Sequence, residues 1–160
     1  MADKLSVLGW WFFDQSKNYE LSRVNHELSK LLFSRLHAIK NGCKCRNVTN
    51  DYAEIEYLSS WVKFFRNKND ALDYAIENKN RSLSQSQDRL VDAQKAQDEL
   101  QSNEYQKFIE LLKSSNNIYA KRYVFMAEKN EHLIKCGIES IKRTVAEYTR
   151  EIERLSSMKD

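Results

Sequence analysis

The sequence predicts an all-α protein built as an elongated antiparallel coiled coil of three long helices. Its 160 residues include no proline and only 3 glycines, and 31% of them are charged. Because proline and glycine are the strongest helix breakers, their scarcity permits long helices. Apolar residues also recur at alternating spacings of three and four over long stretches. Such a repeat places a narrow apolar seam along one helix face, which is typical of a coiled coil.

The most regular part of this repeat predicts a helix over residues 118–157. Within residues 120–155 every seam position is apolar except Glu131. One helix alone cannot bury such a seam, so other parts of the chain or another chain must cover it. We expect the following seam residues to be structural: Ile134, Ile138, Ile141, Val145, Tyr148, Ile152 and Leu155.

An amino-terminal helix is expected over residues 4–40, because apolar residues from Leu21 to Ile39 fall on one helical face. Four consecutive aromatic residues precede this stripe. Neighbouring side chains on a helix point about 100° apart, so one seam cannot absorb all four. The aromatic cluster is therefore the expected partner-binding site, and it consists of Trp10, Trp11, Phe12 and Phe13. The alternative is that two of the four fill the core of the protein.

The middle helix is expected over residues 51–113. Gly42 suits the C-cap that ends the first helix, and the polar residues 114–117 form the second turn. Residues 78–87 have weak helix propensity, so the alternative fold is a four-helix bundle with a break there. Asn69 occupies a seam position, where a lone polar residue fixes helix register. A local bend at Asn69 is the other interpretation.

Together the three helices predict one domain over residues 1–160 that associates with a further chain. If the chain folds back at both turns, the Ile-rich seam of the last helix faces polar residues of the middle helix. These are Lys79, Ser86 and Gln97. Burying an unpaired polar group costs on the order of 1 to 3 kcal/mol. We therefore expect a homodimer or a protein partner that completes the seams.

The sequence contains no catalytic or cofactor motif. Its glycines at positions 9, 42 and 137 stand apart, so they form no phosphate-binding loop. Cys43, Cys45 and His37 lack the fourth ligand that a structural zinc site requires. Cys136 stands in an apolar helical context and is expected to be buried. We therefore expect no enzymatic activity, no cofactor and no metal.

Charge and cysteine content narrow the function classes further. The net charge is +3 and acidic residues are interspersed with basic ones, so we expect no nucleic-acid partner. An odd count of 3 cysteines, together with an amino terminus that lacks the order of a secretory signal, predicts a cytoplasmic location. A basic end is expected near the first turn, formed by Arg35, Lys40, Lys44, Arg46, Lys63, Arg66 and Lys68.

Two functions fit these patterns. The first is a non-enzymatic interaction protein that docks partner helices, as a scaffold, an assembly or secretion chaperone, or a stalk component. In architecture the predicted rod resembles the coiled-coil stalk proteins of bacterial export machines and the secretion chaperones that hold a partner helix. The alternative is a peripheral membrane binder, a dimer of long bent helices of the BAR type, whose basic end or aromatic helix touches anionic lipid. The incomplete seams and the lack of catalytic motifs favour the first.

Overall fold

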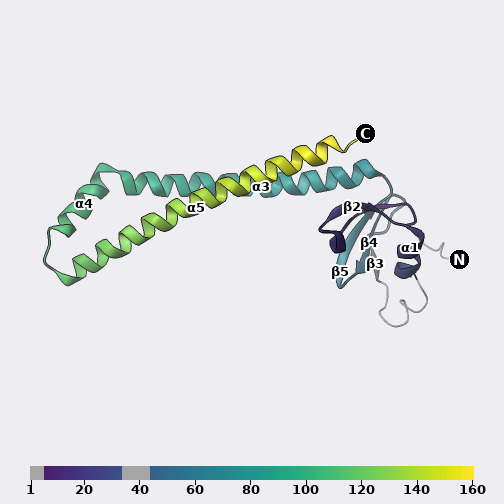
Figure 1. Ribbon diagram of the computed structural model, residues 1–160, viewed down its shortest axis with the longest axis horizontal. Helices are drawn as coiled ribbons and strands as arrows, with labels where there is room; N and C mark the ends of the chain where they lie inside the picture. The colour runs from purple at the N-terminus through teal and green to yellow at the C-terminus, as the bar shows by residue number, and fades with distance from the viewer. Residues whose placement is uncertain (1–5, 34–43) are drawn as a thin grey trace. The chain divides into compact units, whose positions relative to one another are not determined.

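The protein is a mixed α/β molecule, and the all-α prediction is wrong. The computed structural model describes residues 6–33 and 44–160 (Figure 1). Within these residues a five-stranded antiparallel sheet precedes the long helices. The chain divides into two compact units. We call residues 1–76 with 155–160 the sheet unit, and residues 77–154 the helical unit.

The sheet unit is built on five strands. They are β1 (Trp11–Asp14), β2 (Glu20–Arg23), β3 (Cys45–Arg46), β4 (Tyr52–Tyr57) and β5 (Ser60–Phe65). Their order in the sheet is β2-β1-β5-β4-β3, and neighbouring strands are antiparallel. β1 and β2 form a hairpin, and β3, β4 and β5 form a meander. The pairing of Trp11 with Phe65 joins these two sets.

Backbone conformations with positive φ make the tight turns between strands. Leu58 and Ser59, between β4 and β5, have φ of 50° and 61°. Positive φ at both central residues is what a type I′ hairpin turn requires, and its twist matches that of the strands. Between β1 and β2, the short 3-10 helix η1 (Gln15–Lys17) is followed by Asn18 and Tyr19, whose φ values are 54° and 58°. These turns let short strands pair although neither turn contains glycine.

The core of the sheet unit lies between one face of the sheet and α1 (His26–Phe33). The Phe12 and Phe64 rings stack at 5.0 Å between their centroids. Leu28 and Leu32 of α1 pack against the same core. Its buried residues are Val7, Trp10, Phe12, Val24, Leu32, Ala53, Ile55, Val62 and Phe64. The expected helix over residues 4–40 is therefore wrong for residues 11–23, which form a β-hairpin, while residues 34–40 and the expected cap at Gly42 lie outside the described residues.

The start of α3 (Lys68–Gln101) covers part of the opposite face of the sheet. Trp11, Phe65 and Tyr52 stand side by side on neighbouring strands. The ring of Tyr74 lies 5.4 Å from that of Phe65, and Leu72 is fully buried. Because both faces of the sheet are covered here, these strands carry aromatic residues on both sides.

α3 is continuous through residues 78–87, so the four-helix alternative is wrong as well. The helix ends where Ser102 adopts an extended backbone conformation. The Ser102 hydroxyl accepts a hydrogen bond from the Tyr105 N–H at 3.3 Å and so caps α4 (Asn103–Lys113). The expected middle helix over residues 51–113 is thus divided into two strands and two helices.

α5 (Ile118–Ser157) spans the residues for which the three-four repeat predicts a helix. It runs in the opposite direction to α3, to which α4 connects it (Figure 1). All seven expected seam residues on α5 are buried or half-buried, whereas Glu131 is exposed. The Lys79 ammonium of α3 lies 5.4 Å from the centre of the Tyr148 ring of α5. This cation-π contact gives one polar seam residue of α3 a partner within the helical unit.

Candidate functional site

The turn between α4 and α5 is held by contacts on both of its sides. The Phe108 and Tyr123 rings meet edge to face at 5.8 Å. The Lys113 ammonium lies 3.4 Å from the Glu128 carboxylate. At the turn itself, the Asn117 side-chain oxygen accepts a hydrogen bond from the Tyr119 N–H at 2.8 Å and caps α5. The first turns of α5 are therefore held in place beside α4.

These first turns of α5 expose a second apolar stripe. The exposed fractions of Ile118, Tyr119 and Phe125 are 74%, 77% and 65%. Positions 118, 122, 125, 129 and 133 follow steps of four, three, four and four, so they lie on one face of the helix, opposite the seam. We call this face the tip surface. Its apolar residues are Ile118, Tyr119, Phe125, Met126 and Leu133.

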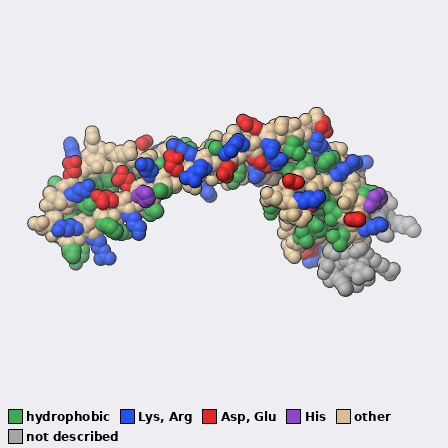
Figure 2. All heavy atoms as spheres, in the orientation of Figure 1, with side chains coloured by type: hydrophobic (Ala, Val, Ile, Leu, Met, Phe, Trp, Pro, Cys, Tyr) green, Lys and Arg blue, Asp and Glu red, His purple; other side chains and the backbone are tan. Residues whose placement is uncertain are grey.

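Three apolar residues of the tip surface form a contiguous patch. Ile118, Tyr119 and Phe125 line a shallow hollow of about 540 Å³ together with Lys121 and Arg122. Figure 2 shows hydrophobic side chains beside basic ones at the end of the helical unit that holds α4 and the start of α5. Single exposed apolar residues are common, but a contiguous patch of them marks an interaction surface. The hollow therefore suits an apolar side chain of a partner.

The charge around the tip surface is positive. Lys121 and Arg122 line the hollow, and no acidic residue lines it; Lys113 is paired with Glu128. Lys129 lies on the tip surface itself, one helical turn beyond Phe125. The potential that these side chains create attracts acidic groups and repels basic ones. A partner that fits this site is apolar at its centre and acidic at its edges.

The sheet places the four expected partner-binding aromatics on its two faces. Phe12 and Trp10 belong to the buried core. Trp11 and Phe13 alternate with Phe12 along β1 and are half-buried on the other face. The Arg23 guanidinium lies 5.8 Å from the Trp11 ring. Partner binding by at least two of the four stays a prediction, and Trp11 and Phe13 are the more exposed of the four.

Asn69, the expected register residue, lies in the first turn of α3. Its side-chain oxygen accepts a hydrogen bond from the Asp160 N–H at 3.4 Å. The Lys68 ammonium meets the Asp160 carboxylate at 2.8 Å, and Lys159 forms an ion pair with Asp73. The start of α3 and the end of the chain are therefore tied by polar contacts within the sheet unit.

Two carboxylates of the sheet unit are buried among the described residues: Asp14, which caps η1 by accepting from the Ser16 N–H at 3.0 Å, and Glu54, which is the centre of a structural network. The Tyr52 hydroxyl donates a hydrogen bond to the Glu54 carboxylate at 2.5 Å, the Arg46 guanidinium forms an ion pair with it, and Lys63 lies 3.8 Å away. The Tyr52 hydrogen bond and the Arg46 contact lower the pKa of Glu54, while burial and the nearby carboxylate raise the pKa of Tyr52. This carboxylate has every partner that a stable ion pair needs, which is typical of a structural group.

Residues with metal-binding side chains do not cluster in the described part of the chain. No group of three or more His, Cys, Asp or Glu side chains there has the arrangement of a metal site. Cys136 is exposed, so the expectation that it is buried is wrong; its sulfur lies 3.6 Å from the His132 ring one helical turn away. Among the described residues, none of the helices is both long enough and apolar enough to cross a bilayer.

Comparison with protein-family models, with curated proteins and with solved structures found no match to this chain. The tip surface is the functional candidate that sequence reasoning missed. Its signal was present in the repeat at residues 118–133, where a second apolar stripe accompanies the seam on the same helix. The intramolecular seam of α5 leaves this second stripe uncovered in the described residues.

Proposed function

We propose that this chain is a non-enzymatic interaction protein whose tip surface docks an amphipathic helix of a partner protein. The observation that carries the proposal is the contiguous exposed patch around Ile118, Tyr119 and Phe125. A common mode of peptide recognition places the apolar face of a helix in a groove. The contacts are made by side chains that are spaced three and four residues apart along the bound helix. Large exposed aromatic and aliphatic side chains are the residues that dominate the energetics of such contacts.

The length of the tip surface supports a helical partner. From Ile118 to Leu133 the stripe covers about 22 Å of helix, at about 1.5 Å per residue. A partner helix of about four turns would pair with the whole stripe. An amino acid sequence with leucines at helical spacing and glutamates beside them would satisfy both the apolar hollow and the basic side chains around it.

The charges on the stripe support a partner other than a second copy of this chain. An antiparallel pairing of two tip surfaces, centred between Phe125 and Met126, would place Arg122 of one copy opposite Lys129 of the other. A parallel pairing would place Arg122 opposite Arg122. Like charges held opposite each other oppose association. The charges therefore favour an acidic partner helix over the expected homodimer.

The test is a binding titration with a defined probe. The probe is a fluorescently labelled synthetic helix of about 20 residues, with leucines at helical spacing flanked by glutamates. We expect saturable binding, and we expect Phe125→Asp to weaken it by at least about tenfold because the change places a charge in the apolar hollow. The matched control is Val91→Asp, which alters an exposed apolar residue of α3 and should leave binding unchanged.

Three results would overturn the proposal. The first is binding that Phe125→Asp leaves intact, and the second is equal affinity for a probe in which lysines replace the glutamates. The third is the absence of probe binding together with co-sedimentation on anionic vesicles that Phe125→Asp abolishes, which would assign the tip surface to a membrane. A cytoplasmic location, expected from the cysteine content, forms part of the proposal and is consistent with a protein partner that presents a free helix.

A further inference from the structure

A polar groove lies at one end of the sheet, apart from the tip surface. It has a volume of about 740 Å³, within the range of about 300 to 1,000 Å³ that small-molecule sites occupy. Its walls come from four segments: Ser6 and residues 8–10 before β1, Arg23 at the end of β2, the loop of residues 48–50, and Arg66 with Asn67 after β5. We call it the end groove.

The end groove is lined by two arginines and no acidic residue. Asn50 adds a side-chain amide that can donate to a ligand. The Thr49 hydroxyl donates to the Tyr52 carbonyl oxygen at 3.3 Å, and the Asn67 amide donates to the Asp70 carboxylate at 3.0 Å. Guanidinium groups bind oxyanions through pairs of parallel N–H bonds and do so better than lysine ammonium groups. The lining therefore has the charge and the donors of an anion site.

Arg23 is held in position by its neighbours. Its Nε–H donates to the Gly9 carbonyl oxygen at 2.9 Å, and its guanidinium lies 5.8 Å from the Trp11 ring. Gly9 has a φ of +80°, and a Cβ at this position would lie 3.4 Å from the Arg23 Nη2 atom. Glycine here therefore supplies the left-handed backbone and leaves the guanidinium room. The Gly9 carbonyl takes one of the five N–H donors of Arg23, so others are available to a ligand.

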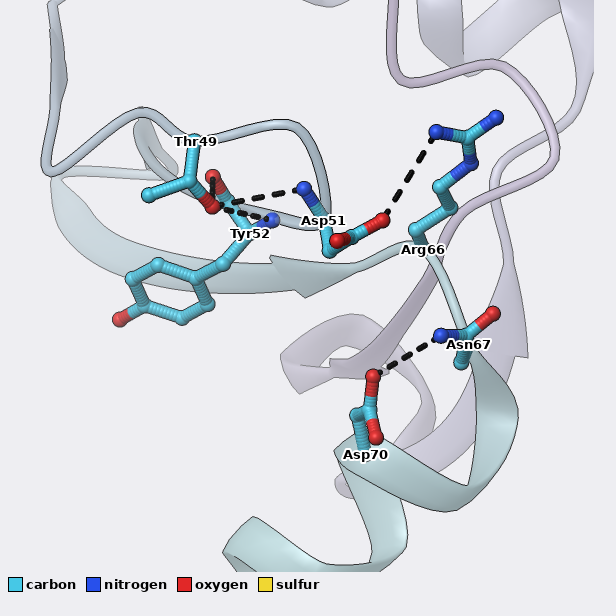
Figure 3. A network of polar contacts seen from close by, with 6 residues as sticks. All are labelled: Thr49, Asp51, Tyr52, Arg66, Asn67 and Asp70. Carbon is cyan, nitrogen blue, oxygen red and sulfur yellow. Dashed lines mark hydrogen bonds and ion pairs between the residues drawn. The ribbon is translucent and has the colours of Figure 1, made fainter.

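The opposite wall carries Arg66, which follows β5 and lies beside an ordered loop at Thr49 to Tyr52 (Figure 3). The Thr49 hydroxyl accepts hydrogen bonds from the Asp51 and Tyr52 N–H groups, at 3.3 Å and 3.0 Å. Arg66 lies 3.7 Å from the Asp51 carboxylate, and both side chains are 61% exposed. An exposed pair of this kind contributes little to stability. Its guanidinium is therefore free to turn toward an anion in the groove at small cost.

Two further features favour a doubly charged oxyanion such as a phosphate group. α3 begins at Lys68, directly after the groove residue Asn67, so the positive end of its helix dipole lies at this wall, where Asp70 of the first turn accepts a hydrogen bond from the Asn67 side chain at 3.0 Å. Two guanidinium groups also match the two negative charges of a phosphate monoester. Leu8 and Val48 add exposed apolar surface to the same lining. These residues suit the carbon skeleton that carries the phosphate.

We infer that the end groove binds a small phosphate monoester, with Arg23 and Arg66 clamping the phosphate and with Leu8 and Val48 contacting its organic part. This inference does not depend on the tip surface, because the groove lies wholly within the sheet unit. The sheet unit would thus bind a small ligand, and the helical unit would bind a partner protein.

Phenyl phosphate is the probe, and the amide signals of the full chain in nuclear magnetic resonance spectra are the readout. We expect saturable shifts at groove residues such as Gly9 and Asn67. Inorganic phosphate should bind more weakly and phenol should cause no shift, because the phosphate and the ring each contribute. Arg23→Gln and Arg66→Gln should each weaken binding by at least about tenfold, since each removes a charge-assisted contact. The control Arg81→Gln, on exposed α3, should leave binding unchanged.

The inference is wrong if phenyl phosphate shifts no groove signal. It is also wrong if Arg66→Gln binds as tightly as the wild type, and this variant is a safe test of folding because Arg66 is exposed. Equal affinity for phenyl phosphate and phenol would leave only an apolar contact and would equally overturn the phosphate assignment. Binding of phosphate-bearing lipid vesicles without binding of phenyl phosphate would assign the groove to a lipid headgroup and contradict the small-molecule claim.

Discussion

The sheet unit and the helical unit use apolar residues in opposite ways. In the sheet unit, aromatic and aliphatic side chains from β1, β4, β5 and α1 meet in one core, and several of them have no exposed surface. In the helical unit the buried side chains are those of Ser86, Ile109 and Ile138, while the tip surface stays open. A paired helix can bury one narrow stripe only. We therefore expect most of the stability to reside in the sheet unit, whereas the tip surface of the helical unit leaves apolar side chains exposed.

The largest expected effect comes from emptying the core of the sheet unit. Phe64→Ala removes a fully buried ring that stacks on Phe12, and a change of this kind costs about 3 to 5 kcal/mol. The free energy of unfolding in urea is the measurement. Phe125→Ala is the control and should cost less than about 0.5 kcal/mol, because an exposed side chain has little packing to lose. Equal losses in the two variants would show that the units do not differ as described.

The seam of the helical unit should come next. Ile138 is 4% exposed on α5, and Ile138→Ala should cost about 2 kcal/mol, the lower end for a buried isoleucine, because few elements surround it. Helix unfolding followed by circular dichroism measures this loss. The control is Met126→Ala on the opposite face of α5, which should leave the transition in place. If Met126→Ala were the more destabilising change, the tip surface and not the seam would hold the helical unit together.

The ion network of the sheet unit predicts a dependence on pH. Because the folded state lowers the pKa of Glu54 below its ordinary value of 4.5, the ionised carboxylate stabilises the fold above that pH. This contribution is lost as the pH falls below about 4.5 and the group takes up a proton. Glu54→Gln should cost about 1.5 kcal/mol at neutral pH and should flatten this acid dependence. Asp51→Asn, in an exposed pair, serves as the control. If Glu54→Gln lost as much stability at low pH as the wild type, Glu54 would not be the source of the acid dependence.

The smallest effect is expected where the end of α5 meets the start of α3. The Asp160 carboxylate is 78% exposed and pairs with Lys68, so Asp160→Asn should cost under about 1 kcal/mol and the loss should shrink in high salt. Thermal melts at two salt concentrations measure it. A loss as large as that of Phe64→Ala would mean that polar contacts, and not the core, hold the sheet unit together.

The sequence predicts the fold correctly where apolar residues recur with a single helical spacing, as they do in α5. The three-four repeat predicts a helix over residues 118–157, and α5 occupies that range. The same rule fails at residues 52–65. Ile55, Val62 and Phe65 fall at helical spacing by coincidence, although they belong to strands whose side chains alternate between two faces.

The strands were hidden for two physical reasons. Trp11, Phe12 and Phe13 are apolar in succession because both faces of β1 are covered, so no polar alternation marks the period of two. The turn at Leu58 and Ser59 has positive φ at both residues without the Asn-Gly or Asp-Gly pair that usually marks such a turn. Sequence patterns record the preferences of single residues, whereas here the sheet imposes the conformation.

The two candidate sites also differ in whether the sequence could predict them. The tip surface could have been predicted, because Ile118, Phe125 and Leu133 recur on one face of a helix. The end groove was not readable, because Gly9, Arg23 and Arg66 stand far apart in the chain and meet only through the order of the strands. A site on one helix follows from spacing, but a site between strand ends requires the topology.

Hydrogen exchange followed by mass spectrometry, with and without the acidic helical probe, tests the division of roles most directly. We predict that β4 and β5 exchange slowest in the free protein, because they lie in the main core. The probe should leave their rates unchanged and should protect residues 118–133 of α5. Two results would contradict this division of roles. One is slower exchange in the helical unit than in the sheet unit, and the other is protection by the probe in the sheet and not at the start of α5.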